Sequence, residues 1–357
     1  MKPCAVWPKR HLNRVLRAAR RACYRASLAR CSSAGALLPI RNHLELALPL
    51  LRSRRTRWAL QAAALALSLG LTLLAARWLA TRGFPLAHAE PALVAATAAL
   101  FLVALAVKSH AWSRLFRPQE RPSSTTLAAA TGAAAVLGIA LPGRVDDAAR
   151  IAIVRWLTGR RTAVSTTAFS LFALGLVDVI ALTPLASAGA TSSGSPAIQA
   201  GLAVVAFAGV GAAGVVVLLP RLADGGLARF RLVAWLAAQA PTMRDASRAV
   251  VLVAGAWMLR GVGIYLLLHA LGVHLSFLAA LVYVCASAAA SALPTGLAGA
   301  FSGAGAGAAV LVASGIDAGQ ALTVALSVQL LGAMVGAAAV LAAAAWHGVG
   351  RIRLAVA

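Results

Sequence analysis

Long apolar windows of about 18 to 25 residues, separated by short polar segments, follow one another along the chain after residue 57. Each window is long enough for a helix to cross the hydrocarbon core of a bilayer. The windows are rich in Ala, Leu and Val and lack period-two alternation, which favours helices over barrel strands. The six predicted full spans are Trp58 to Ala80, Pro91 to Val107, Val164 to Ala188, Ile198 to Leu219, Val250 to Leu271 and Ala318 to Trp346.

Two shorter apolar stretches, Thr126 to Leu141 and Phe277 to Leu293, end in a Leu-Pro step that is followed by glycine. An interrupted backbone at membrane depth is tolerated only where it is buried in protein or lines a cavity. Corresponding breaks in the two halves of a chain point to a transporter-type binding site. The residues of the predicted hairpin breaks are Pro142, Gly143, Pro294 and Gly296.

The positive charges decide how these two stretches are placed. If both crossed fully, the arginine-rich segment from Arg144 to Arg161 would lie outside, against the positive-inside rule. If Thr126 to Leu141 dips in and returns, that segment and the basic loop from Lys108 to Arg121 both become cytosolic. A second hairpin, Phe277 to Leu293 returning through Gly299 to Ala313, then enters from the opposite face. Eight plain spans remain the alternative, because the charge rule is statistical.

Each predicted hairpin is flanked by two spans, and the two units begin on opposite sides of the membrane. The sequence therefore predicts an all-α integral membrane protein, a polytopic bundle of six full spans and two re-entrant hairpins arranged as an inverted repeat. The segments Arg144 to Arg161 and Gly225 to Arg248 are expected to be interfacial helices in the membrane plane. The predicted domains are a basic cytosolic segment (1–56), a flippase-like membrane domain (57–347) and a short cytosolic tail (348–357).

The net charge of +24 is concentrated at the start of the chain, where 14 of the 33 basic residues precede Trp58 against a single acid, Glu45. This distribution predicts a multi-pass protein of the cell (inner) membrane with a cytosolic N-terminus that contacts anionic headgroups. Nucleic-acid binding would require interleaved aromatic residues or a recognisable module, so no nucleic acid is expected as a partner.

The sequence offers no arrangement of residues that would support catalysis. It has no His/Cys metal set, no Gly-x-Ser-x-Gly elbow, no phosphate loop and no paired carboxylates in an acid/base arrangement. We therefore expect a protein that is not an enzyme and that uses neither a metal nor a cofactor.

Charged residues inside or beside the apolar segments are the candidates for substrate binding. Arg144 would begin the helix that returns after the break, where unpaired N–H groups and a guanidinium together suit a phosphate. The alternative is an arginine that reaches to the headgroups from the interface. Asp147 follows on the same segment, where Asp146 and Asp147 form a helix-start pair that Arg150 matches.

Asp178 and Arg260 lie deep within their spans, roughly 21 Å from the cytosolic end for Asp178 and roughly 15 Å from the start near Val250 for Arg260, at 1.5 Å per residue. A lone charge at mid-bilayer costs about 2.5 to 3.5 kcal/mol, so a pair sharing a water-filled cavity is one reading and a purely structural ion pair is the other. Gly299, Gly303 and Gly307 recur at four-residue spacing, which predicts a helix face for close packing. The predicted substrate-binding residues are Arg144, Asp147, Arg150, Asp178 and Arg260.

The run from Leu141 to Arg150 resembles the Pro-Gly-Arg-x-Gly-Glu-x-x-Arg signature of the lysylphosphatidylglycerol synthase transmembrane-region family, a flippase-like membrane domain. Asp146 stands where glycine is usual, and Asp147 stands in for the glutamate. Asp178 matches an aspartate that follows the signature. Pro294 to Gly315 is similar to the Pro-rich and Gly-rich segment of the family's second half, with Ala304 where a glutamate belongs. The resemblance, as a divergent stand-alone member, covers roughly Trp58 to Trp346.

The resemblance implies a lipid flippase or transporter that moves a phospholipid or another polar lipid between leaflets. Its partners would then be membrane phospholipids or other polar lipids. The alternative is a non-transporting membrane partner that recruits a lipid- or glycan-modifying enzyme through its basic N-terminal segment.

Overall fold

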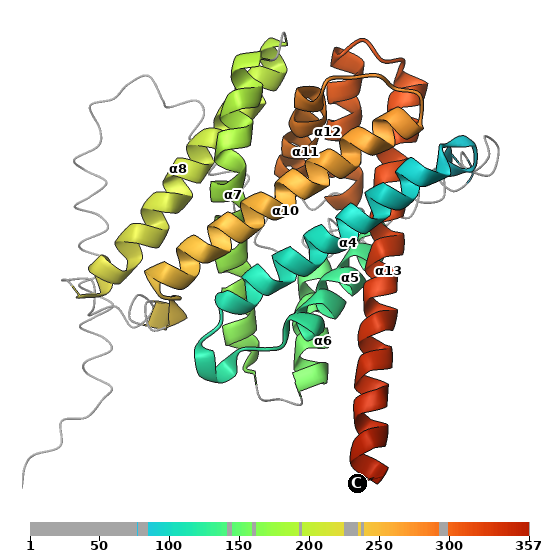
Figure 1. Cartoon of the computed structure of the whole chain (residues 1–357). Coiled ribbons are helices and arrows are strands. Elements are labelled where there is room, and N and C mark those ends of the chain that lie inside the picture. Colours follow the sequence, from blue (N-terminus) through green and yellow to red (C-terminus); the bar gives the residue numbers. More distant parts are fainter. Residues whose placement is uncertain are drawn as a thin grey trace, which may run out of the picture. The chain divides into compact units, whose positions relative to one another are not determined.

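The structure is a computed structural model that describes Arg77 and residues 85–140, 145–158, 162–192, 195–224, 235–236, 239–292 and 299–356. The chain divides into two compact units, Met1–Ala62 and Ala63–Ala357, and all described residues lie in the second. Every regular element among them is helical (Figure 1). The elements are η1 (Pro85–His88), α4 (Pro91–Arg114), η2 (Pro118–Glu120), α5 (Ser124–Ala140), α6 (Val145–Thr158), α7 (Val164–Ser192), α8 (Pro196–Asp224), α10 (Met243–Ala270), α11 (Phe277–Ala292), α12 (Gly299–Ala313) and α13 (Ala318–Val356).

Five of the described helices, α4, α7, α8, α10 and α13, are long and apolar enough to cross a membrane, with mean hydropathies of 1.9 to 2.4. Large apolar side chains on them point outward, for example Phe207 and Val251, which are 78% and 71% exposed. An outer surface of this kind is suited to lipid rather than to water. Five of the six predicted spans are thereby confirmed in a polytopic helical membrane protein, and the sixth, Trp58 to Ala80, lies outside the described residues.

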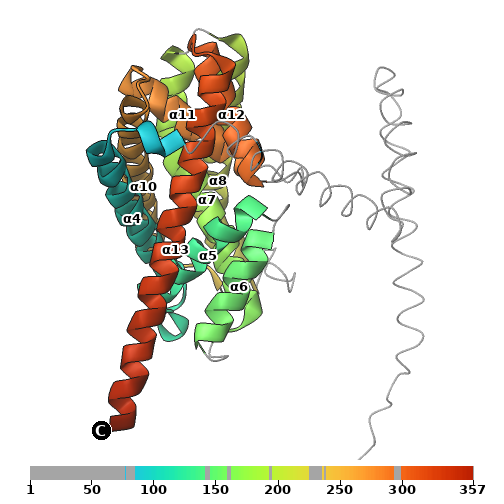
Figure 2. The same ribbon diagram turned by 90° about the vertical axis from the view of Figure 1, so that its right-hand side faces the viewer.

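Helices α4 and α10, the first helices of the two predicted repeats, lie side by side and antiparallel (Figures 1 and 2). At one end the backbone N–H of Glu90 donates to the carbonyl of Ala270 over 3.3 Å. At the other end the Arg114 guanidinium lies 3.9 Å from the Asp245 carboxylate. The start of each helix therefore meets the end of the other, as corresponding helices of an inverted repeat must.

The first hairpin is formed by α5 and α6. Helix α5 is one continuous helix of 17 residues, and the returning helix α6 begins at Val145, directly after the predicted start at Arg144, which lies outside the described residues. The segment predicted as an interfacial helix, Arg144 to Arg161, instead contains the returning arm, α6. Leu127 near the start of α5 and Val154 near the end of α6 are fully buried in one apolar cluster, so both ends of the hairpin lie together.

The second hairpin, α11 and α12, matches its prediction. The Ser302 hydroxyl donates to the carbonyl of Ala290 over 3.2 Å, which holds the two antiparallel arms together near the turn. Further along, Gly303 lies against Ser287 and Gly307 lies against the ring of Tyr283. The predicted glycine face is confirmed as a packing face at these two positions.

The two hairpins enter from opposite ends of the bundle. At the first end the Trp112 indole N–H donates to the hydroxyl of Ser170 over 3.0 Å, which joins the end of α4 to the start of α7 on either side of the first hairpin. At the other end a cavity of about 950 Å³ is lined by Glu90, His269 and Gln320, from the start of α4, the end of α10 and the start of α13. The second hairpin leaves and rejoins the bundle at this end.

Each hairpin packs on the last helix of the other repeat. Helix α5 crosses α13 where Gly132 meets Gly336, and a Cβ at either glycine would collide with the backbone carbonyl of the other. Correspondingly, α11 packs on α7, where Gly189 lies against Val282. This exchange of partners is the pattern that an inverted repeat produces. Helix α8 packs on α7 and lies outside both repeats.

Two further boundaries differ from those predicted. Of the second expected interfacial helix, Gly225 to Arg248, residues 225–234 lie outside the described part, and the residues from Met243 onward already belong to α10. Helix α13 continues past Trp346 to Val356, so most of the predicted tail is helical (Figure 1). The predicted basic segment 1–56 lies outside the described residues.

Candidate functional site

A cluster of charged and aromatic side chains lies where α4, α7 and α10 meet. The Asp178 carboxylate of α7 forms an ion pair with Lys108 of α4, with 2.8 Å between Nζ and Oδ1. The Trp257 indole N–H of α10 donates to the same oxygen over 3.1 Å. The Lys108 ammonium also lies 4.6 Å from the centre of the Trp257 ring, so a cation–π contact closes the triangle. One carboxylate thus joins helices from both repeats.

Arg260 lies three residues after Trp257 on the same face of α10. Its guanidinium is 5.3 Å from the ring centre of Phe101 and 5.8 Å from that of Trp257. Among the described residues it makes neither an ion pair nor a hydrogen bond, and its interaction with Asp178 is electrostatic, without direct contact. The structure therefore brings both predicted residues close to Trp257, but the direct partner of Asp178 is Lys108.

The return arm of the first hairpin adds a third cation, Arg150 of α6. It pairs with Asp147 over 2.9 Å and with Asp146 over 3.5 Å. Its charge acts electrostatically on Lys108, which places this arm beside the cluster. Because two carboxylates already face Arg150 and one faces Lys108, Arg260 is the cation of this cluster that no carboxylate contacts within the described part of the chain.

Lys108 is the residue of the cluster that sequence reasoning missed. The span predicted from the sequence ends at Val107 and a cytosolic loop begins at Lys108, whereas α4 continues for seven residues to Arg114. The apolar residues after Lys108 supplied the missing signal. Trp112 and Leu115 continue the helical spacing of the span, and both are buried.

Several predicted residues lie outside the described part of the chain: Arg144, Pro142, Gly143, Pro294 and Gly296. Their roles stay predictions. In the residues that the structure does describe, no group of three or more His, Cys, Asp and Glu side chains is placed to hold a metal ion.

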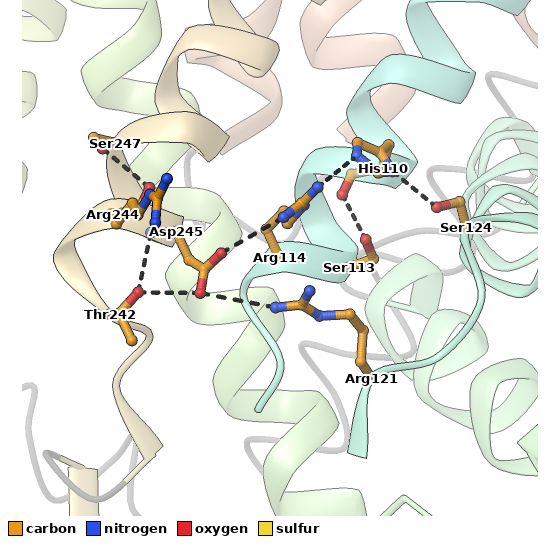
Figure 3. A network of polar contacts seen from close by, with 9 residues as sticks. All are labelled: His110, Ser113, Arg114, Arg121, Ser124, Thr242, Arg244, Asp245 and Ser247. Atoms are coloured by element: carbon orange, nitrogen blue, oxygen red, sulfur yellow. Dashed lines mark hydrogen bonds and ion pairs between the residues drawn. The ribbon is translucent and has the colours of Figure 1, made fainter. Parts of the chain in front are cut away.

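A second polar network fastens the two repeats at the end where the first hairpin enters (Figure 3). Asp245 near the start of α10 faces Arg114 at 3.9 Å and Arg121 at 3.8 Å. Its backbone N–H donates to the hydroxyl of Thr242, which caps α10. Through these ion pairs the network joins the two repeats.

Fold and cluster together define a polytopic helical membrane protein built as an inverted repeat, with charged groups held between the repeats. A family model described as the lysylphosphatidylglycerol synthase TM region matches residues 61–340. The chain therefore belongs to that family. Comparison with curated proteins and with solved structures finds no match.

Proposed function

We propose that this protein is a flippase that moves a phospholipid or another polar lipid between the leaflets of the cell (inner) membrane. The family and the membrane-spanning helices make it a membrane protein related to lipids. The proposal adds transport itself, a cytosolic N-terminus and the absence of catalysis, since moving a lipid between leaflets changes no covalent bond.

The observation that carries the proposal is the charge of Arg260. A charged side chain at mid-bilayer costs about 2.5 to 3.5 kcal/mol, so one that no carboxylate neutralises is expected to serve a function. A guanidinium presents several N–H donors in a fixed plane and binds phosphate in bidentate fashion. Arg260 lies on the first helix of the second repeat and faces Phe101 of the first repeat, so a ligand there would contact both.

In the proposed mechanism the headgroup enters between the repeats while the acyl chains stay in the bilayer. Arg260 holds the lipid phosphate, and Arg144 contributes from the break of the first hairpin. The Lys108–Asp178 pair balances the charge between the repeats as the phosphate arrives and leaves, and Asp147 pairs with Arg150. Hairpins that enter from opposite ends support a site that opens alternately to each leaflet.

The test is leaflet exchange of fluorescently labelled phosphatidylglycerol in proteoliposomes, read by quenching of the outer leaflet. Arg260→Ala should slow exchange about tenfold or more, because a charge-assisted hydrogen bond contributes about 1.5 to 3 kcal/mol. Arg248→Ala is the matched control, since Arg248 is exposed on the same helix. Arg260→Lys should recover part of the rate. Wild-type exchange by a folded Arg260→Ala protein would remove this residue from the mechanism.

A further inference from the structure

Tyr283 of α11 has a buried hydroxyl that no described group satisfies. The residue is fully buried, and its oxygen has no hydrogen-bond partner in the part of the chain that the structure describes. A buried polar group without a partner costs about 1 to 3 kcal/mol, so native proteins keep few of them. Phenylalanine would fill the same space without this cost, and the hydroxyl therefore calls for an explanation.

The glycine face of α12 fixes the position of this hydroxyl. A Cβ at Gly307 would lie 2.5 Å from Cε2 and 2.6 Å from Cζ of the Tyr283 ring. Only glycine leaves room for the ring at this place. The second hairpin thus holds the tyrosine rigidly between its two arms, and Ser287 and Gly303 keep the arms equally close further along.

Tyr283 also lies at the level of Arg260. Gly261, the next residue of α10, packs against the side chain of Leu281, two residues before Tyr283 on α11. The hydroxyl of Tyr283 and the guanidinium of Arg260 are close enough to interact electrostatically. Among the described residues, a cation that no carboxylate contacts and an O–H group without an acceptor therefore lie near each other, one on each of two helices that pack together.

We infer that Arg260 and Tyr283 form one anion subsite for the phosphate of a lipid headgroup. This inference rests on the proposed function and names the ligand chemistry of its site. The guanidinium supplies charge and N–H donors, and the Tyr283 hydroxyl donates a hydrogen bond to a phosphoryl oxygen. An anion satisfies both unpaired groups at once, whereas an uncharged headgroup leaves the guanidinium unpaired.

The decisive variant is Tyr283→Phe, which keeps the ring against Gly307 and removes only the donor. Binding of labelled phosphatidylglycerol to the full-length protein in detergent should weaken about tenfold or more, the loss expected for one hydrogen bond to a charged group. Labelled diacylglycerol, which lacks the phosphate, should bind both proteins alike. Tyr265→Phe is the matched control, because Tyr265 lies on α10 against His269 and Phe277.

The double variant Arg260→Ala/Tyr283→Phe should bind little more weakly than Arg260→Ala alone, because the two groups act on one phosphate. Equal binding by Tyr283→Phe and Tyr265→Phe, or an equal loss for diacylglycerol, would overturn the subsite. Displacement of the lipid by millimolar inorganic phosphate would show that free phosphate is the ligand, and would overturn the assignment to lipid.

A second pair of variants tests the subsite without changing the tyrosine itself. Gly307→Ala should displace the ring and weaken phosphatidylglycerol binding as Tyr283→Phe does, whereas Gly305→Ala, where a Cβ meets open space, should not. Wild-type binding by Gly307→Ala would contradict the inference. If the wild type binds phosphatidylglycerol through both residues but exchanges no lipid, transport fails and the subsite stands.

Discussion

The two repeats occupy equivalent places in the fold but contribute different chemistry to its centre. The first repeat supplies the ion pair of Lys108 with Asp178 and, on the return arm of its hairpin, Arg150 with two carboxylates. In the second repeat, α10 to α13 carry one arginine away from their ends, Arg260, and both arms of the hairpin lack charged residues. That hairpin supplies glycines and a buried hydroxyl instead.

This difference shows that an inverted repeat can keep its geometry while its halves specialise. Close packing in the second hairpin depends on small residues such as Gly303 and Gly307. Charges in the first hairpin are tolerated because they are paired within one helix, as Arg150 is with Asp146 and Asp147. Arg260 is the exception to this difference between the repeats, because it brings a cation from the second repeat into the charged region of the first.

The largest effect is expected when the paired charges of the first repeat are separated. Asp178→Asn leaves Lys108 without its carboxylate and should lower the free energy of unfolding by about 2 kcal/mol, less than for a fully buried pair. The value is reduced because the two side chains are 27% and 21% exposed. The measurement is an SDS titration in mixed micelles, followed by circular dichroism.

The control for this prediction removes both partners. Lys108→Met/Asp178→Asn should be more stable than Asp178→Asn alone, because no uncompensated charge remains. If the double variant is as unstable as the single one, the loss comes from the Asp178–Trp257 hydrogen bond or from packing, and the charge argument is wrong.

Much of the fold could be predicted from the sequence, because the length of each apolar stretch depends only on consecutive residues. The second hairpin, with its return from Gly299 to Ala313, was predicted for this reason. For the first hairpin, the sequence predicted a returning helix that begins at Arg144 but also favoured an interfacial helix over Arg144 to Arg161, because Asp146, Asp147 and Arg150 look too polar for the interior when each is counted alone. Their pairing along one helix becomes visible only in the structure.

For the site, the sequence predicts how deep the charged residues lie in their spans, but not how each helix is rotated about its axis. Asp178 and Arg260 were assigned to similar depths, and both do lie beside Trp257. Which side chains face each other depends on how neighbouring helices are turned about their axes, and a single sequence does not contain that information. Lys108 was therefore missed as the partner of Asp178, and the unsatisfied hydroxyl of Tyr283 gave no signal.

The next effect concerns how the first hairpin is held by the second repeat. Gly132→Ala would place a methyl group against the carbonyl of Gly336 on α13, so the two helices must move apart. Overpacking of this kind costs about 1 to 3 kcal/mol, and we expect about 1.5 kcal/mol from the same titration.

Gly138→Ala, on the same helix, is the control, because a Cβ at Gly138 meets open space. Alanine also has the higher helix propensity, so this variant should be as stable as the wild type or slightly more stable. Equal stabilities of the two variants would show that the α5–α13 crossing does not depend on the glycine pair.

The smallest effect is expected at the network where the second repeat supplies the acid and the first supplies the cations. Asp245→Asn should lower the free energy of unfolding by about 0.5 kcal/mol, because partly exposed ion pairs at 3.8 to 3.9 Å contribute little. The loss should shrink in high salt, which screens the wild-type pairs. Asp317→Asn at the start of α13 is the control, since Asp317 caps its helix and faces no cation among the described residues. A loss at Asp245 that is independent of salt would mean that this carboxylate acts through the cap of α10 rather than by joining the repeats.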